Sequence, residues 1–385
     1  MIRVKVVTVN NRGFIRNLFD YKYRDISFVY DQDSMYEIPS VIRKKMAEVI
    51  KWPIFDFLGI FKIIKNLEVK EDICFSYNRF LKTNKPYVIL LENPSALVNY
   101  SWDRPKHLLA KKKLNDCFSD PMLKGIVCMS SACYKYLPNL YELPEKLSVY
   151  QNYPLIMDDD HYLFGDIKKK FEHSTIKLLF VSADFELKGG RDLLLVHKRL
   201  KEKGFEFSLS IITKKDGIRN DDLQYIKNTK NINLIEFNLS KTELNQYYMD
   251  AAILVNPTRW DSFNLVTLEA IKYGCAVVAT DMYAIKEMVR DGYNGYLETP
   301  MYKLWDEDGK MNKYYRTHQK KCFYDGHIDT KLVDSMEKHL SDLLNNRKKL
   351  EIMCENSFNL SREGKFSEKY VVELWNEILR KGVEQ

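Results

Sequence analysis

The sequence predicts an α/β protein built from two doubly wound domains, each with a parallel sheet between helices. The chain has 385 residues, enough for two domains of about 100–200 residues each. Short, continuously apolar runs alternate with helical periodicities along most of it, as in strands buried on both faces of a parallel sheet. A polar stretch around residues 153–170 separates two such series, and we interpret it as the linker between the domains.

The apolar and helical periodicities give the positions of the expected elements. Expected strands lie at residues 4–9, 87–91, 125–129, 178–181, 208–212, 232–237, 252–255 and 276–279. Expected helices lie at residues 190–203, 242–249, 265–272 and 367–381. Residues 301–326 have no apolar period, and we interpret them as a loop insertion. These boundaries predict a first domain at residues 1–160 and a second at 170–366.

The chain carries a mild excess of positive charge. It has 60 Lys and Arg against 53 Asp and Glu, a net charge of +7. Such an excess suits an anionic partner, such as a nucleoside diphosphate, an acidic membrane surface or a nucleic acid. Solubility alone accounts for it equally well, so charge does not choose among these partners.

Cysteine usage and the N-terminal residues bear on location. The seven cysteines form no C-x-x-C pair, and an odd count in a long chain favours a reducing compartment over a disulfide framework. Cys128 and Cys275 lie in apolar runs typical of a core. The first residues lack signal-peptide features, and no apolar run approaches ~18–20 residues. The sequence predicts a cytoplasmic protein without a transmembrane helix.

The most informative stretch is VNPTRWDSFNLVTLEAIKYG, residues 255–274. A predicted strand ends at Val255, a loop with Asp261 follows, a helix begins near Leu265, and Glu269 lies eight residues after Asp261. The first N–H groups of a helix are unpaired and carry roughly +0.5 charge, so they bind phosphate. The two carboxylates could accept hydrogen bonds from sugar hydroxyls. The alternative is a solvent-facing helix start that Asp261 caps.

The segment DSFNLVTLEAIKYG resembles the E-x7-E segment of family 4 glycosyltransferases, usually E-x-F-G-x-x-x-x-E-A-x-A-x-G. In that family the first acid contacts the transferred sugar, the amides between the acids hold the diphosphate, and the second acid binds the ribose. The resemblance implies the first role for Asp261 and the last for Glu269. The residues implied in diphosphate binding are Ser262, Phe263, Asn264, Leu265 and Val266. Asn264 replaces the family's Gly, and we expect only its backbone to matter.

A second segment, FVSADFELKGGRDLL at residues 180–194, resembles the strand–loop–K-G-G part of the same family. Glycine lets a backbone approach a ligand closely, and a Lys ammonium can neutralise charge that develops on phosphate. The resemblance implies that Lys188, Gly189 and Gly190 contact the donor diphosphate, with Lys188 and Asp261 catalytic. The family often has an Arg a few residues earlier, where this chain has S-A-D. By itself, K-G-G is also a common start of a helix.

Residues 234–258 lie between these two segments and resemble the family's strand–turn–helix–strand passage. In this passage Phe237 is expected near the nucleotide base. Simple packing of Phe237 in the core is an equal alternative.

The resemblance implies the GT-B fold, in which two Rossmann-like domains face each other across a cleft. The acceptor would bind the N-terminal domain, and the C-terminal helix, residues 367–385, would cross back onto it. Many relatives have a His where this chain has Glu92, so the resemblance gives Glu92 a role as catalytic base or sugar contact. The alternative is a loop carboxylate paired with Arg104 or His107.

Residues 40–65 are basic and aromatic. Their Lys and Arg could contact an anionic membrane while Trp52, Phe55, Phe57 and Phe61 enter its surface. A core-facing helix pair broken at Pro53 is an equal alternative.

Asp158, Asp159 and Asp160 form a D-x-D pattern, the metal–diphosphate signature of the other large glycosyltransferase fold. This pattern lies in the expected linker rather than at a strand end, and no Cys/His cluster suggests zinc. We expect no metal and no cofactor beyond the donor substrate.

The resemblance implies transfer of a sugar from a nucleoside diphosphate sugar, with UDP or GDP expected, to an acceptor hydroxyl with retention of configuration. The expected acceptor is a saccharide or lipid-linked saccharide in the assembly of a surface polysaccharide or other glycoconjugate. We expect no nucleic-acid partner and a location in the cytoplasm, including the inner face of the membrane. The alternatives are a GT-B epimerase or phosphorylase, or a non-catalytic nucleic-acid or membrane binder that kept the fold.

Overall fold

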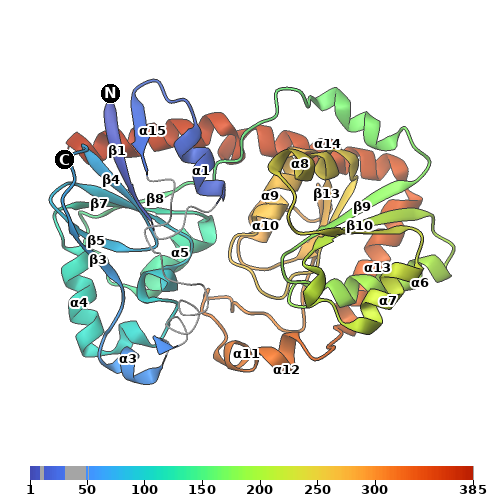
Figure 1. The fold of residues 1–385 in the computed structure, drawn as a ribbon, viewed down its shortest axis with the longest axis horizontal. Helices are drawn as coiled ribbons and strands as arrows, with labels where there is room; N and C mark the ends of the chain where they lie inside the picture. Colours follow the sequence, from blue (N-terminus) through green and yellow to red (C-terminus); the bar gives the residue numbers. More distant parts are fainter. Residues whose placement is uncertain (9–12, 31–48, 51, 385) are drawn as a thin grey trace. The chain divides into compact units, whose positions relative to one another are not determined.

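The computed structural model describes residues 1–8, 13–30, 49–50 and 52–384. It divides into two compact units, each with its own six-stranded parallel sheet (Figure 1). Unit 1 consists of Met1–Met157, Asp308–Lys310 and Lys365–Gln385, and unit 2 of Asp158–Glu307 and Met311–Gly364. In the described part of the chain, no helix is both long and apolar enough to cross a bilayer.

The sheet of unit 1 has the order β2-β1-β4-β6-β7-β8, and every neighbouring pair is parallel. Its strands are β1 (Ile2–Val7), β2 (Ile26–Val29), β4 (Ile73–Tyr77), β6 (Tyr87–Leu91), β7 (Leu123–Cys128) and β8 (Ser148–Gln151). Every residue of the central strands β4 and β6 is buried, which explains their continuous apolar runs. A separate pair of short strands joins β3 (Ile63–Leu67) and β5 (Phe80–Thr83).

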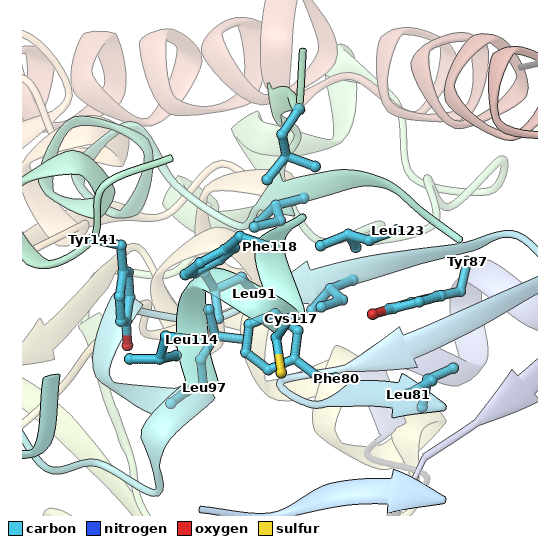
Figure 2. Close-up of a cluster of buried hydrophobic side chains, with 14 of the residues drawn as sticks. Phe80, Leu81, Tyr87, Leu91, Leu97, Leu114, Cys117, Phe118, Leu123 and Tyr141 are labelled. Atoms are coloured by element: carbon cyan, nitrogen blue, oxygen red, sulfur yellow. The ribbon is translucent and has the colours of Figure 1, made fainter. Parts of the chain in front are cut away.

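Helices cover both faces of this sheet. The helices of unit 1 are α1 (Gly13–Asp20), α3 (Pro53–Phe57), α4 (Leu108–Phe118), α5 (Ser131–Leu140) and the C-terminal α15 (Glu368–Glu384). Of these, α5 lies against β7 and β8, and α15 against β4, β6 and β7, whereas α3 packs on α4. Figure 2 shows the core under α4, where Phe80, Leu91 and Phe118 pack together. On α15, Trp375 packs against Phe75 of β4 with the ring centroids 5.5 Å apart. The last helix therefore completes the core of unit 1, as the sequence predicts.

The sheet of unit 2 has the order β11-β10-β9-β12-β13-β14, again with all pairs parallel. Its strands are β9 (Ile176–Val181), β10 (Phe207–Thr213), β11 (Ile232–Glu236), β12 (Ile253–Asn256), β13 (Ala276–Thr280) and β14 (Gly295–Glu298). Its helices are α6 (Gly190–Glu202), α7 (Asn220–Asn228), α8 (Lys241–Asp250), α9 (Leu265–Lys272), α10 (Ile285–Met288), α11 (Lys313–Thr317), α12 (Gln319–Phe323), α13 (Thr330–Asn345) and α14 (Arg347–Arg362).

The observed elements agree with the periodicities. Each of the expected strands overlaps an observed strand, and the expected helix at residues 265–272 has the bounds of α9. The elements that the sequence analysis did not locate include the edge strands β2 and β14 and most elements of the first 70 residues. These strands have four residues each, too few for a clear apolar run.

The boundary between the two units, at 157/158, falls within the expected linker at residues 153–170, but the C-terminal end of this stretch is packed into unit 2. Residues Phe164–Phe171 form a 3-10 helix whose Ile167 and Lys170 are buried in unit 2. The Nζ of Lys170 donates hydrogen bonds to the carbonyls of Tyr248 (2.6 Å), Met249 (2.7 Å) and Ala251 (2.7 Å). These carbonyls end α8, so Lys170 caps that helix, and its burial lowers its pKa.

The interpretation of residues 301–326 as a loop insertion is incomplete. The segment contains α11 and α12, and it buries Leu304, Trp305, Cys322 and Phe323. These apolar residues form two adjacent pairs that are far apart in the sequence, so no helical period joins them.

Part of the basic segment at residues 40–65 lies outside the described residues, namely 40–48 and 51. After Pro53 the chain forms α3 and then β3, while most of the helix expected before Pro53 lies outside the described residues. Phe61 is buried, but Trp52 and Phe57 have 57% and 60% of their surface exposed. The alternative of a core-facing helix pair is therefore wrong for these two residues.

Candidate functional site

The topology of unit 2 identifies where a ligand would bind. The strand order reverses between β9 and β12, because the chain adds β10 and β11 on one side and β13 and β14 on the other. Open α/β sheets bind ligands outside the carboxyl ends of the strands at such a reversal. The loop after β9 carries Lys188, and the loop after β12 carries Asp261.

Lys188 and Asp261 meet at this point. The Nζ of Lys188 lies 2.6 Å from the Oδ2 of Asp261 and also donates to the carbonyl of Trp260. The two side chains retain 22% and 14% of their exposure, so a ligand can reach them. The structure thus brings together the two residues of unit 2 for which the sequence implies catalytic roles.

The two glycines after Lys188 allow the loops to meet. Gly189 has φ +77°, and a Cβ there would lie 2.3 Å from the carbonyl oxygen of Pro257. A Cβ on Gly190 would lie 2.3 Å from the ring of Phe185. The glycines are therefore required by loop packing at this site, whether or not they also approach a ligand.

Asn264 has a larger role than its backbone alone. Its φ is +67°, a left-handed conformation that Gly and Asn adopt most readily, which accounts for either residue at this position. Its Oδ1 accepts from the backbone N of Thr267 (2.9 Å) and caps α9, while its Nδ2 donates to the Oδ2 of Asp261 (2.7 Å). The expectation that only its backbone matters is wrong, because the side chain links the helix start to the carboxylate.

The start of α9 faces the same loop. The first N–H groups of a helix have no acceptor within it, which here applies to Leu265 and Val266. The Oδ1 of Asp261 accepts from the backbone N of Ser262 (2.9 Å), and the ring of Phe263 is buried below the loop. The loop can therefore offer backbone donors to an anion beside the Lys188 ammonium.

Glu269 lies on α9 one turn further along, and two residues of α8 hold its carboxylate. The Nζ of Lys241 lies 2.5 Å from its Oε1, and the hydroxyl of Tyr248 donates to its Oε2 at 2.9 Å. Burial, with the Glu269 carboxylate beside it, raises the pKa of Tyr248 well above its usual value, so it remains a donor. The sequence analysis missed Lys241 and Tyr248 as partners of Glu269.

Phe237 follows β11, at the edge of the sheet that is two strands from β9. Its side chain is 40% exposed, and its backbone N donates to the carbonyl of Thr213 at 3.1 Å. The alternative of simple core packing is wrong for Phe237, and contact with a nucleotide base stays a prediction.

Residues 301–327 pack onto both loops of the site. The indole Nε1 of Trp305 donates to the carbonyl of Asp261 at 2.6 Å. The hydroxyl of Tyr324 donates to the Oδ2 of Asp184, in the loop after β9, at 2.8 Å. The rings of Phe323 and Trp260 meet edge to face with centroids 5.7 Å apart. No motif signals these contacts, which join residues far apart in the sequence.

A buried ion pair anchors the loop that carries Asp261. Arg259 bonds Asp192 in the first turn of α6, and both side chains are almost fully buried. The other carboxylate oxygen of Asp192 accepts from the backbone N of Asp329 at 2.8 Å. Asp192 thus holds the Arg259 guanidinium in place. Removing one partner of such a buried pair typically costs about 3–5 kcal/mol of folding stability.

Glu92 lies in unit 1, directly after β6. Its Oε2 accepts hydrogen bonds from the hydroxyls of Tyr77 (2.8 Å) and Tyr100 (3.4 Å). The alternative partner Arg104 bonds Asp56 instead, with 2.9 Å between Nη2 and Oδ1.

The D-x-D residues are bound into unit 2 by ordinary ion pairs. Asp158 contacts Lys272 (2.7 Å) and Arg362 (3.1 Å), and Asp159 accepts from the hydroxyl of Tyr273 (3.4 Å). These contacts give Asp158 and Asp159 a structural role at the start of unit 2. In the ranges the structure describes, no three His, Cys, Asp or Glu residues are grouped as metal ligands.

Comparisons with known proteins bear on this site. Residues 175–302 match a family described as "Glycosyl transferases group 1". An uncharacterized glycosyltransferase of Methanocaldococcus jannaschii is 25% identical over 313 residues, which are 76% of this chain and 79% of that protein. An uncharacterized 41.2 kDa protein in the cps region of Klebsiella pneumoniae is 29% identical over 114 residues, 28% of this chain and 32% of its own length. The chain thus matches about a third of the Klebsiella protein.

Solved structures identify the fold. HepE of Anabaena in complex with UDP superposes with a TM-score of 0.62 at 14% identity, covering 99% of this chain and 100% of HepE. The chain has the GT-B fold, and the predicted fold class is confirmed. Lys188, Asp261 and Glu269 all lie within the range that matches the glycosyltransferase family.

Proposed function

We propose that this protein is a glycosyltransferase that moves a sugar from a nucleoside diphosphate sugar to an acceptor hydroxyl. The observation that carries the proposal is the pair of Lys188 and Asp261, 2.6 Å apart at the reversal point of the unit 2 sheet and beside the start of α9. A cation and a helix N-terminus suit a diphosphate, and a carboxylate suits sugar hydroxyls.

In the proposed reaction the acceptor oxygen bonds to the anomeric carbon while the bond from that carbon to the diphosphate breaks. Lys188 and the N–H groups of residues 263–266 stabilise the charge that develops on the departing diphosphate. Such preorganised donors are typically worth about 3–4 kcal/mol each. These groups supply the positive charge that the leaving group requires, so the proposed reaction needs no metal. Retention of configuration is proposed from the resemblance to family 4 glycosyltransferases alone.

The hydrogen-bond partners of Asp261 and Glu269 and the exposure of Phe237 indicate which part of the donor each residue would contact. The Lys188 ammonium and the Asn264 amide both contact Oδ2 of Asp261. When a diphosphate binds, Lys188 would pair with it as well as with Asp261. Asn264 would then keep the Asp261 carboxylate oriented toward the sugar. Glu269, held by Lys241 and Tyr248, would accept from the ribose hydroxyls. Phe237, exposed after β11, would lie against the base.

The acceptor side of the proposal concerns unit 1. Two tyrosine hydroxyls orient the Glu92 carboxylate, which suits it to accept a hydrogen bond or a proton from an acceptor hydroxyl. The similar Klebsiella protein is described as lying in a cps region, which supports a saccharide acceptor in polysaccharide assembly. HepE was solved with UDP and with UDP-glucose, which supports a UDP-sugar as the first donor to test.

The cysteines support a reducing location. All seven are free and buried, so the fold does not depend on a disulfide. We propose the cytoplasm as the site of action.

The first test is thermal stabilisation by UDP, GDP, ADP, CMP and TDP, each with and without Mg²⁺. A ligand at about 100 times its dissociation constant adds about 2.7 kcal/mol of stability, which raises the melting temperature measurably. We expect one nucleotide to stabilise the parent without Mg²⁺ and to stabilise Glu269→Gln less.

Transfer to an acceptor is tested separately, with the matching nucleotide sugar and a panel of saccharides. Release of nucleotide that depends on a saccharide supports the proposal. Interconversion of the donor sugar without any acceptor would identify an epimerase, and no stabilisation by any nucleotide at millimolar levels would contradict a donor site in unit 2.

A further inference from the structure

A group of exposed apolar side chains lies on α3 and the first turn of α4 in unit 1. Large apolar side chains in contiguous exposed groups of this kind mark sites of interaction. We call this group the apolar face, and its members, 45% to 85% exposed, are Trp52, Ile54, Phe57, Leu58, Leu108 and Leu109. Leu108 is the most exposed of them, and it sits at the beginning of α4.

Contacts between the two helices join these side chains into one surface. Gly59 follows α3 with φ +61°, and a Cβ there would lie 2.5 Å from the backbone N of Ala110. The rings of Phe57 and His107 meet edge to face at 6.0 Å. The end of α3 therefore lies against the start of α4, as Figure 1 shows within unit 1.

A buried ion pair fixes which side of α3 faces outward. Asp56 of α3 is buried and lies 2.9 Å from the guanidinium of Arg104, whose side chain is fully buried. Arg104 also donates to the carbonyl of Val98 at 2.7 Å. Because α3 turns Asp56 inward, Ile54 and Phe57 on its other side keep 52% and 60% of their surface exposed.

The surroundings of the apolar face are strongly basic. Residues 52–65 and 103–113 contain seven Lys or Arg and only two Asp or Glu, a net +5 of the chain's net +7. One of the two acids is Asp56, which Arg104 neutralises, and the other is Asp103, which pairs with Lys106 at 2.8 Å. Lys111 of this group also pairs with Glu142 at 2.6 Å, and with that acid included the surroundings of the apolar face keep a net charge of +4.

We propose that the apolar face docks onto a lipid bilayer that contains anionic lipids. Exposed Trp, Phe and Leu with surrounding Lys are the composition of surfaces that lie in the membrane interface. Lysine stems can extend along the apolar residues and place their ammonium groups at lipid phosphates. A protein partner fits less well, because Lys is depleted at protein–protein interfaces.

This surface lies on unit 1 and uses none of the donor residues, so the proposal is independent of the proposed function. Its consequence is that the enzyme would act at a membrane surface, where a lipid-linked acceptor is presented.

The test is flotation of the purified full chain with vesicles of phosphatidylcholine alone or of phosphatidylcholine with phosphatidylglycerol. We expect the parent to float only with the anionic vesicles, and less well as NaCl is raised. Leu108→Ser/Leu109→Ser should weaken the binding about a hundredfold or more, because each buried Leu contributes about 1.5–3 kcal/mol. Ile352→Ser, which removes an exposed apolar residue of unit 2, is the matched control and should float like the parent.

A second pair of variants separates charge from apolar contact. Lys106→Gln/Lys112→Gln should weaken binding to anionic vesicles by about thirtyfold, since each Lys near such a surface contributes about 1 kcal/mol. Trp52→Ser/Phe57→Ser repeats the apolar test on α3 should the Leu variant lose its folded circular dichroism spectrum.

The proposal is overturned if the parent fails to float with anionic vesicles, or if the folded apolar variants float as well as the parent. It is also overturned if the parent sediments as a dimer that Leu108→Ser/Leu109→Ser converts to a monomer, because a second copy would then cover the face.

Discussion

The two units have parallel sheets of equal size, but their carboxyl strand ends are built differently. In unit 2 the order reverses between β9 and β12, and there Lys188 and Asp261 from the two following loops form an ion pair. In unit 1 the order reverses between β1 and β4, and the loop after β1 includes residues outside the described ranges. The carboxylate nearby is Glu92, after the next strand β6, and it accepts from two tyrosine hydroxyls.

This difference shows how one architecture can serve two kinds of ligand. An ammonium beside a helix N-terminus favours an anion, which suits the phosphates of a donor. A carboxylate oriented by hydroxyl groups offers acceptor oxygens and favours a ligand that donates hydrogen bonds, such as a saccharide. The sheets themselves do not decide the chemistry, and the residues at the strand ends do.

The largest effect is expected from removing the Lys188 ammonium, the cation at the strand ends of unit 2. Lys188→Met should lower turnover by about 10²–10³, which corresponds to about 3–4 kcal/mol of transition-state stabilisation. Lys198→Met, which replaces an exposed Lys of α6, is the control. Initial rates with a saturating sugar nucleotide measure the effect, and a turnover equal to the control would remove Lys188 from the site.

A buried histidine with a shifted pKa should make the stability of unit 2 sensitive to acid. Burial lowers the pKa of His197 to about 4, and its ring nitrogens contact Tyr225 (2.9 Å) and Asn231 (3.0 Å). As the pH falls from 6.5 toward 4, the unfolded chain binds a proton that the folded chain does not. His197 should therefore lower the free energy of unfolding as the pH falls through this range, by up to roughly 3 kcal/mol near pH 4.

Urea unfolding at several pH values checks this prediction. The free energy of unfolding of the parent should fall more steeply between pH 6.5 and 4 than that of His197→Gln, which does not titrate. Equal slopes for the two proteins would mean that His197 is protonated in the folded state.

Asn264 tests whether the helix start of unit 2 is shaped for an anion. Asn264→Ala removes the cap and places an Ala at positive φ, which should destabilise the protein by about 2 kcal/mol. Asn264→Gly keeps the backbone conformation and should cost about half as much. Both should weaken nucleotide binding, since Asp261 loses the Asn264 amide. A Gly variant less stable than the Ala variant would contradict the backbone explanation.

The smallest expected effect concerns Trp305, a positioning residue outside the two donor loops. Trp305→Phe removes the donor to the Asp261 carbonyl and should raise the KM for the donor about fivefold, as for a loss of about 1 kcal/mol. The melting temperature and kcat should change little, and Trp52→Phe in unit 1 should change neither constant. A lowered melting temperature with an unchanged KM would reduce Trp305 to a purely structural role.

The parts of the fold that could be predicted from sequence are those with local signals. Buried parallel strands such as β6 and β13 are continuous apolar runs, so their positions were predicted closely. The segments around Lys188 and Asp261 were found because each follows such a strand directly. The polar composition of residues 153–170 gives no sign that Lys170 is buried in unit 2.

The supporting contacts of the candidate site could not be predicted in the same way. Trp305 contacts the carbonyl of Asp261 from 44 residues further along the chain, after α9, β13, α10 and β14, and Tyr248 reaches Glu269 from a different helix. Such contacts depend on how loops and helices pack in three dimensions, and no sequence period encodes them. For Asn264 a signal did exist, because the Gly of the motif that this segment resembles and the Asn here are the residues that tolerate positive φ.

The most direct test of the central claim is calorimetric titration of UDP, or whichever nucleotide stabilises the parent, into Lys188→Met and Glu92→Gln. The account predicts that Lys188→Met weakens nucleotide binding at least tenfold, whereas Glu92→Gln binds the nucleotide like the parent. Equal nucleotide affinity in Lys188→Met and the parent, or a loss confined to Glu92→Gln, would contradict a donor site at the strand ends of unit 2.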